Sequence, residues 1–220
     1  MRIRVKDSLK VFSAILVLPL LWHACAVWAA PEDDYRSGAD AYRGGDVVGA
    51  MELLRKSADA GHAPSQSLLA YILDKAEFDN EAIAYYRKAA AQGDPDGEYG
   101  LGSMYATGEG VKRDPAEARK WITRAARKGH AAAINSLAQA YMDGALGFDE
   151  TQRNSAEALR WVRLAADSGY WPALEGLAAA YRTGAYGLAV DVQQAEVLAV
   201  RGRAARGVAE KRVVRAKEKK

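Results

Sequence analysis

The sequence predicts an all-α protein, an α/α solenoid built from about five stacked helix pairs. Alanine, the strongest helix former, makes up 45 of the 220 residues, and its small side chain lets helices pack closely. A pattern of alanine, glycine and aromatic residues recurs every 32 to 40 residues, which is the length of two helices and their turns. One Cys and three His exclude a disulfide framework and argue against a metal site, so apolar packing must hold the helices together.

Glycine residues mark the end of each repeating unit. The motif Ala-Ala-x-x-Gly ends at Gly93, Gly129 and Gly169, and a variant of it ends at Gly61, with spacings of 32, 36 and 40 residues. Glycine readily adopts the left-handed conformation that commonly follows the last residue of a helix. The motif therefore predicts that the second helix of each unit ends just before its glycine.

Aromatic residues recur in register with the glycine motif. Trp121 and Trp161 lie at equivalent places in the second helices, and tyrosines recur in the first helices. Recurrence at the repeat spacing favours a role in packing neighbouring helices over a role in an aromatic cofactor site. We expect both tryptophans to be buried. The positions predicted to be structural are Tyr105, Trp121, Gly129, Tyr141, Trp161, Gly169 and Tyr181.

Polar residues predict where the second helices begin. Asp46, Asp114, Asn154 and Asp191 each lie four residues before an aligned alanine. Asp and Asn side chains accept hydrogen bonds from the free N–H groups of a first helical turn, so these four residues are expected N-caps. Phe78 stands at the equivalent place in the second unit, which predicts an irregular turn there.

The third unit carries a family resemblance. It holds the segment 97–105 (Gly-Glu-Tyr-Gly-Leu-Gly-Ser-Met-Tyr), the loop 108–111 (Gly-Glu-Gly-Val), Trp121 and the glycine motif. In this order it resembles a full Sel1-like repeat. Units four and five are similar, whereas the first two lack the loop and look closer to tetratricopeptide repeats. The resemblance covers about 35–207 and implies an α/α solenoid that serves as a protein-binding scaffold.

The first 29 residues have the pattern of a secretory signal peptide. Four basic residues precede an apolar run at 11–22, and small residues follow it. We expect cleavage near 26–30 and a mature protein in the periplasm or secreted. The alternative is an inner-membrane anchor, because the apolar stretch reaches ~20 residues. The solenoid is assigned to 30–207 and a basic C-terminal tail to 208–220.

Charge is distributed unevenly along the chain. Residues 30–200 carry a net charge of −7, whereas 201–220 carry +7. The basic tail is expected to be a soluble end cap. Alternatively, it is attracted to anionic lipid headgroups, to an acidic polymer or to the acidic body of this protein.

The sequence contains no recognisable catalytic motif. The sequence has neither a P-loop nor a dinucleotide-binding glycine fingerprint. His62 and His130 follow helix-ending glycines at equivalent repeat positions, which favours a role in the turn over metal ligation. We therefore predict no catalytic residue, no metal site and no cofactor, and a protein that is not an enzyme.

The concave face is the expected binding surface, because solenoids hold extended partners on the face lined by their first helices. Tyr71 is a strong candidate, since Leu73 already fills the core position of its repeat. Tyr170 and Trp171 are further candidates or form a wedge between repeats. The predicted surface residues are Arg36, Asp40, Arg43, Ser67, Tyr71, Asp74, Tyr99, Ser103, Asn135, Gln139, Met142, Glu175 and Arg182.

This mixture of aromatic, amide and oppositely charged side chains suits a peptide or a protein loop and is unlike a uniformly basic nucleic-acid track. We predict an exported, non-catalytic adaptor or regulator that binds another envelope protein. The alternative is a scaffold for an envelope polysaccharide, with or without a carbohydrate-modifying activity. Membrane contact is expected only through the signal sequence or weakly through the basic tail.

Overall fold

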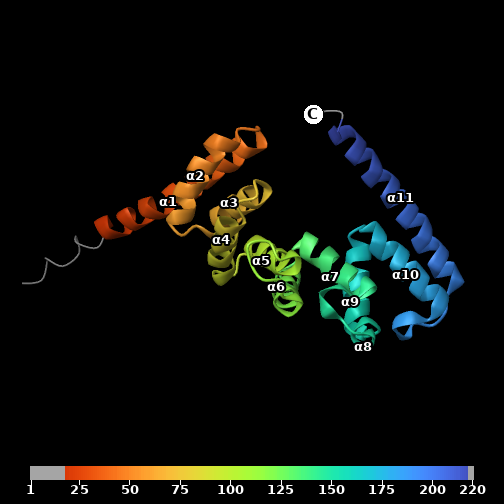
Figure 1. Cartoon of the computed structure of the whole chain (residues 1–220). Helices are drawn as coiled ribbons and strands as arrows, with labels where there is room; N and C mark the ends of the chain where they lie inside the picture. The colour runs from red at the N-terminus through yellow and green to blue at the C-terminus, as the bar shows by residue number, and fades with distance from the viewer. Residues whose placement is uncertain (1–17, 218–220) are drawn as a thin grey trace, which may run out of the picture.

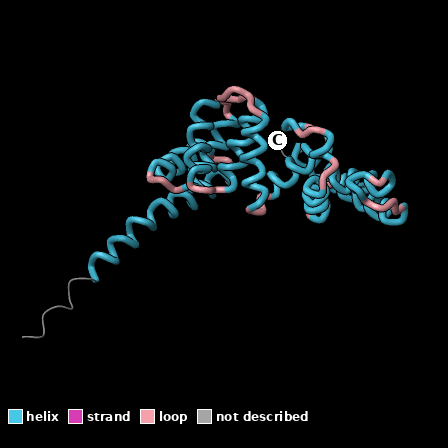
Figure 2. Tube along the Cα trace, turned by 90° about the horizontal axis from the view of Figure 1, so that it is seen from below, coloured by secondary structure: helices cyan, strands magenta, loops and turns pink. Residues whose placement is uncertain are grey.

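The protein is an all-α solenoid, as predicted. The computed structural model describes residues 18–217, with side chains placed for 31–208, Lys211 and Lys217. Over these residues it contains eleven α-helices, two short 3-10 helices and no strand (Figure 2). The helices are α1 Leu18–Arg43, α2 Val47–Asp59, α3 Ala63–Lys75, α4 Asp79–Ala91, α5 Pro95–Thr107, α6 Pro115–Arg127, α7 Ala131–Asp143, α8 Glu150–Arg153, α9 Ala156–Asp167, α10 Trp171–Thr183 and α11 Val192–Lys217.

The helices pair in sequence and the pairs stack into an arch. The pairs are α1 with α2, α3 with α4, α5 with α6, α7 with α9, and α10 with α11. The short helices η1 Ala145–Gly147 and α8 fill the insertion in the fourth pair, and η2 Ala185–Gly187 lies in the loop of the fifth. In Figure 1, α3, α5, α7 and α10 border the inner side of the arch, and α4, α6, α9 and α11 lie outside.

The turns follow the glycine pattern. Gly61, Gly93, Gly129 and Gly169 all have left-handed backbone angles, with φ between 81° and 94°. Each follows the last residues of a second helix, as the motif predicts. A side chain in this conformation would strain the backbone, which explains why glycine recurs there.

Three of the four predicted N-caps are confirmed. Asp46, Asp114 and Asp191 each accept a hydrogen bond from a first-turn N–H group. Asn154 was the wrong residue, because α9 begins one residue later and Ser155 accepts the bond from the Ala158 N–H (3.1 Å). The α8 insertion accounts for the error, since Asn154 instead ends that extra helix.

The two tryptophans are not equally buried, which corrects one expectation. Trp161 is 2% exposed and lies in the C-terminal core, where Tyr141 is buried as well. Trp121 is only half-buried, at the edge of the N-terminal core. Its indole N–H donates to the Glu117 carboxylate (3.0 Å), and the Arg124 guanidinium covers the ring at 4.6 Å. These hydrophilic neighbours keep one edge of Trp121 near solvent. The tyrosines at 105 and 181 are likewise half-buried.

Close helix contact within a pair depends on small residues. A Cβ atom at Gly102 of α5 would lie 2.7 Å from Ile122 Cγ1 and 3.0 Å from the backbone nitrogen of Ile122 in α6. Ala118, whose carbonyl oxygen would lie 3.2 Å from the same Cβ, is fully buried at this interface. The alanine content thus reflects tight packing as well as helix propensity.

Both ends of the solenoid are helical. Helix α11 continues without a break past 207, where a separate tail was expected to begin. Residues 1–17 of the expected signal peptide lie outside the described residues. Helix α1 starts at Leu18 and runs through the expected cleavage region into the first repeat. Within 18–217, no helix is long and apolar enough to cross a membrane.

Candidate concave binding surface

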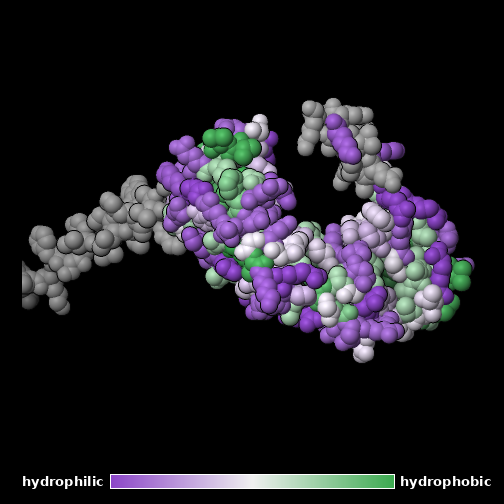
Figure 3. All heavy atoms as spheres, in the orientation of Figure 1, coloured by the Kyte–Doolittle hydropathy of each residue, from purple (hydrophilic) through white to green (hydrophobic). Residues whose placement is uncertain are grey.

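The inner side of the arch is a continuous surface built from α3, α5, α7 and α10. In the space-filling view of Figure 3, the mouth of the arch opens between the N-terminal helices and α11, and its visible edges are mostly hydrophilic. The repeat geometry places the same helical positions on this face in every unit. Aromatic and amide side chains occupy several of these positions.

An exposed aromatic pair lies near the N-terminal end. Tyr71 of α3 is 42% exposed, and its ring meets the edge of the Tyr42 ring at 6.4 Å with an interplanar angle of 87°. The Lys75 ammonium lies 5.6 Å from the centre of the Tyr71 ring and 3.5 Å from Asp74. Partial burial and the neighbouring Tyr71 raise the pKa of the Tyr42 phenol, so Tyr42 is neutral at pH 7. Their rings offer apolar contact area with little conformational entropy to lose.

A central polar patch lies on α5, α7 and the start of α10, and consists of Tyr99, Asn135, Ser136, Gln139 and Tyr170. The Tyr99 and Ser136 hydroxyls are hydrogen-bonded across α5 and α7 at 3.1 Å. The Tyr170 hydroxyl donates to the Gln139 side-chain oxygen across the next repeat boundary at 3.3 Å. Burial is the main cause of the raised pKa of Tyr170, followed by the nearby Asp143 carboxylate. The patch is therefore uncharged and held in place by bonds between repeats.

Asn135 has an unused hydrogen-bonding group in this patch. Its side-chain oxygen is buried and has no partner among the described residues, although the residue as a whole is half-buried. A buried polar atom without a partner costs about 1–3 kcal/mol. Because this oxygen is buried, a bound chain can supply the missing N–H group only after the Asn135 side chain turns toward the surface, which makes Asn135 a candidate contact for a peptide backbone.

Not every predicted residue lines an open surface. Ser67 is 3% exposed, and its hydroxyl donates to the Ala63 carbonyl of its own helix (3.2 Å), so its assignment to the binding surface was wrong. A serine in a helix commonly bonds back to the preceding turn, and here the packing of α3 covers it. Ser103 bonds back in the same way to the Tyr99 carbonyl (3.0 Å) but is half-buried. Met142 packs beside Gly176.

The charged members of the predicted row pair with neighbours. On α1, Arg36 pairs with Glu32 (3.0 Å) and Arg43 pairs with Asp40 (2.6 Å). At the other end, charged residues of α10 face α11. Glu175 pairs with Arg206, which also lies 4.4 Å above the Trp171 ring, and Arg182 lies 3.7 Å from Glu196. The free binding groups are therefore the aromatic and amide side chains.

His130 serves the turn before α7, whereas His62, at the equivalent place before α3, makes no side-chain cap and lies 2.8 Å from the Ser65 hydroxyl. His130 Nδ1 accepts a hydrogen bond from the Ala133 N–H (3.0 Å), so it caps α7 while Nε2 reaches Asp96 of α5 (2.9 Å). Its ring lies 4.7 Å from that of Tyr99 and so supports the central polar patch. Within 18–217, no group of three His, Cys, Asp or Glu side chains is arranged to hold a metal ion.

Two residues with specific contacts, Ser136 and Glu98, were not predicted from the sequence. Ser136 stands one position outside the predicted row, and only the packing of α5 against α7 brings it to Tyr99. Glu98 is fully buried, with ion pairs to Arg124 (2.8 Å) and Lys128 (2.9 Å) of α6. The available signal for Glu98 was an acid at the position that Ile134 and Leu174 occupy in the later repeats, although Gln66 makes the same position polar in α3.

Comparison with known families settles what kind of repeat this is. The Sel1 repeat model matches more than half of the chain, at residues 35–62, 79–94, 95–130 and 131–170. The chain belongs to the Sel1 repeat family. Sel1 repeats form scaffolds that mediate protein–protein interaction, and the fold is generally non-catalytic. The N-terminal units, which look closer to tetratricopeptide repeats, are thus partly matched as Sel1 repeats too.

Solved Sel1 structures share the architecture. A Sel1 repeat protein from Oxalobacter formigenes has a TM-score of 0.63 at 25% identity, over 83% of this chain and 74% of that one. A protective antigen of uropathogenic Escherichia coli has a TM-score of 0.53 at 26% identity, over 85% and 48%. A Sel1 repeat protein from Klebsiella pneumoniae has a TM-score of 0.55 at 21% identity, over 80% and 90%, and supports the fold alone.

Two curated relatives match locally. The rat DAP3-binding cell death enhancer 1 is 32% identical over 83 residues, which are 37% of this chain and 16% of the relative. The chitin synthase regulator SKT5 of Saccharomyces cerevisiae is 35% identical over 102 residues, which are 43% of this chain and 15% of the relative. The chain thus spans less than a fifth of the length of either relative.

Proposed function

We propose that this Sel1 solenoid is an exported adaptor or regulator that holds an extended segment of another envelope protein in its arch. The central polar patch carries the proposal. It offers a buried, unpartnered amide oxygen at Asn135, with the patch tyrosines Tyr99 on α5 and Tyr170 at the start of α10. An extended peptide can bond its backbone to the amide and place its side chains against the rings.

The exposed Tyr71 extends the surface toward the N-terminal repeats. Tyrosine is enriched among residues that dominate binding energy, and a half-exposed ring can change partners without loss of core packing. The charged side chains at both ends of the arch are already paired, so we expect apolar and backbone contacts to dominate the affinity.

Export rests on the order of basic, apolar and small residues at the N-terminus. The similar proteins support an adaptor or regulatory role, because one curated relative is a DAP3-binding protein and another is a regulator of chitin synthase. N-terminal sequencing of the protein from the cell envelope should find a mature start within 26–30. A start at Met1 would overturn the export proposal.

The test is site-specific photo-crosslinking in living cells. A photoreactive amino acid at Tyr71 or Gln139 should capture one defined protein, whereas the same group at Arg87, on the outside of α4, should not. Tyr71→Ala should then weaken binding of the captured protein about 5- to 150-fold, which corresponds to ~1–3 kcal/mol. Equal capture at all three sites would overturn the concave site. Capture of polysaccharide alone would favour the alternative scaffold.

A further inference from the structure

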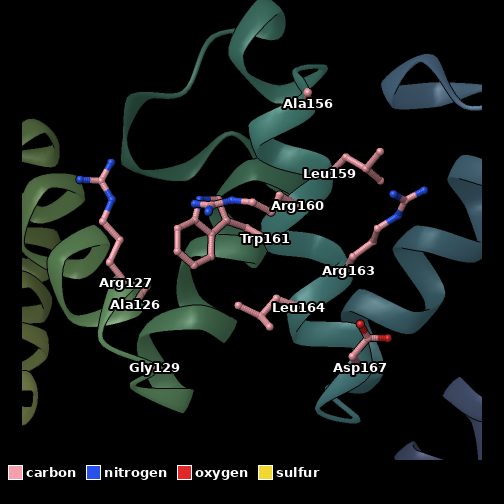
Figure 4. Close-up of a pocket in the computed structure, with 10 residues that line it drawn as sticks. All are labelled: Ala126, Arg127, Gly129, Ala156, Leu159, Arg160, Trp161, Arg163, Leu164 and Asp167. Carbon is pink, nitrogen blue, oxygen red and sulfur yellow. The ribbon is translucent and has the colours of Figure 1, made fainter.

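The outer side of the solenoid has a hollow that the concave site does not use. It lies between the end of α6 and helix α9 and has a volume of about 680 Å³. Figure 4 shows Trp161 and Leu164 of α9 on the side of the helix toward Ala126 and Gly129, and Leu159 of α9 also lines the hollow. Leu164 is 44% exposed, so the hollow offers an apolar contact surface to solvent.

Three arginines surround this apolar surface. Arg127, Arg160 and Arg163 line the hollow, and Asp167 is the one carboxylate among its lining residues. Within the described part of the chain, none of the three guanidinium groups forms an ion pair. Arg160 instead lies over the Trp161 ring at 4.4 Å, and Arg163 donates to the Tyr181 hydroxyl at 3.4 Å. The hollow is thus suited to an apolar side chain surrounded by carboxylates.

The turn between α3 and α4 has this composition. Phe78 is 58% exposed and lies between Glu77 and Asp79 in the sequence, whereas the nearby Glu81 pairs with Arg55 of α2. The turn also breaks the repeat rules. Phe78 replaces the Asp that caps other second helices, and Glu77 adopts a left-handed φ of 63° without being glycine. Both features cost stability, and such local violations concentrate at functional sites.

The two halves of the chain differ in charge in the same sense as the turn and the hollow. Residues 31–110 contain 15 acidic and seven basic side chains, whereas 111–220 contain 12 acidic and 20 basic ones. The turn at Phe78 lies in the acidic half and the hollow in the basic half. Helices α5 and α6 separate them within one copy (Figure 1), so the two surfaces meet only between copies.

We propose that the chain associates with itself by seating Phe78 of one copy in the arginine-lined hollow of the next. The two surfaces differ, so the contact is head-to-tail, and each added copy leaves one turn and one hollow free. The contact area is small, which makes the association weak and dependent on concentration. Opposite charges direct the two surfaces toward each other, and salt weakens the contact.

Sedimentation velocity of the purified chain over a concentration series tests the proposal. The wild type should form species larger than a dimer as concentration rises, and less of them at high salt. Phe78→Ala and Arg160→Glu should each weaken association at least about tenfold, as expected for central contact residues. Arg87→Glu is the matched control, because Arg87 is exposed on α4 and forms no ion pair among the described residues. It should associate like the wild type.

Mixing provides a second, independent readout. Phe78→Ala retains the hollow and Arg160→Glu retains the turn, so an equimolar mixture should form one-to-one pairs that neither variant forms alone. Far-UV circular dichroism of each variant confirms that the helices are intact. A wild type that stays monomeric at every concentration would overturn the proposal, as would a mixture that does not pair. Tyr71→Ala should leave self-association unchanged, which separates this surface from the concave site.

Discussion

Replacement of Glu98 by leucine should stabilise the protein. Glu98 is the fourth residue of α5 and is fully buried, and the equivalent residues of α7 and α10 are Ile134 and Leu174. One carboxylate oxygen pairs with Arg124 and Lys128, whereas the other is buried with no partner among the described residues. The native acid thus occupies a site that the later repeats fill with apolar side chains, whereas α3 has the buried Gln66 there.

The magnitude follows from three contributions. A buried leucine side chain stabilises by about 1.5–3 kcal/mol. Removal of the unpartnered oxygen relieves about 1–3 kcal/mol. The two lost ion pairs are worth about 0–1 kcal/mol each, because Arg124 and Lys128 are 44% and 40% exposed and can return to water. Together these contributions amount to a gain of about 0.5–6 kcal/mol, so we expect Glu98→Leu to raise the free energy of unfolding.

The opposite change is the control. Replacing both Arg124 and Lys128 by methionine leaves the carboxylate buried without a cation and should destabilise by about 3–5 kcal/mol. Urea unfolding followed by far-UV circular dichroism measures both variants, with the slope against urea checking that the same surface is exposed. A Glu98→Leu variant that folds normally but loses more than about 1 kcal/mol would refute this reasoning.

Three further predictions concern packing and pH. Trp161→Ala should lower the free energy of unfolding in urea by about 3–5 kcal/mol, because Trp161 is buried. Trp121→Ala should lower it by only about half as much, because Trp121 is half-buried. Equal losses in the two variants would contradict this difference in burial. Gly102→Ala should destabilise the protein by about 1–3 kcal/mol in thermal melts, because the new Cβ would meet backbone atoms of α6. Gly176→Ala should be neutral or stabilising in the same assay, because its Cβ would meet only the flexible end of Met142. Burial, with a smaller effect of Asp74, raises the pKa of the Tyr86 phenol well above its ordinary value. The contribution of Tyr86 to stability should therefore be constant up to about pH 10 and then fall by up to about 1.4 kcal/mol per pH unit as the unfolded tyrosine ionises, and Tyr86→Phe should remove that share of the slope.

Much of the fold was predictable, because in repeat proteins the helices and turns depend mainly on residues that are close together in the sequence. Helix ends depend on single residues: glycine at Gly129 and Gly169 permits the left-handed turn, and Asp114 caps its own helix. These effects act within a few residues of the chain. The error at Asn154 arose because an inserted helix shifted the start of α9 by one residue, which alignment of the repeats could not reveal.

The candidate site was less predictable, because side-chain exposure depends on neighbouring repeats. The sequence predicted that Tyr71 and Tyr99 line the concave surface. It predicted the same for Ser67, although packing buries that residue. It also could not show that Glu175 and Arg182 pair with residues of α11. Those partners lie many residues away in the chain and meet only when the last helix folds back on α10.

The sequence by itself determined the class of protein: the repeat length, the helix boundaries and the alanine-rich interfaces all follow from interactions between near neighbours. The tertiary structure alone decided which side chains are left exposed or without a partner. Asn135 on the inner side, the arginines around Trp161 on the outer side and the exposed Phe78 differ from ordinary surface residues only in what surrounds them. Burial and pairing are properties of residues brought together from different helices, and no single segment of the chain encodes them.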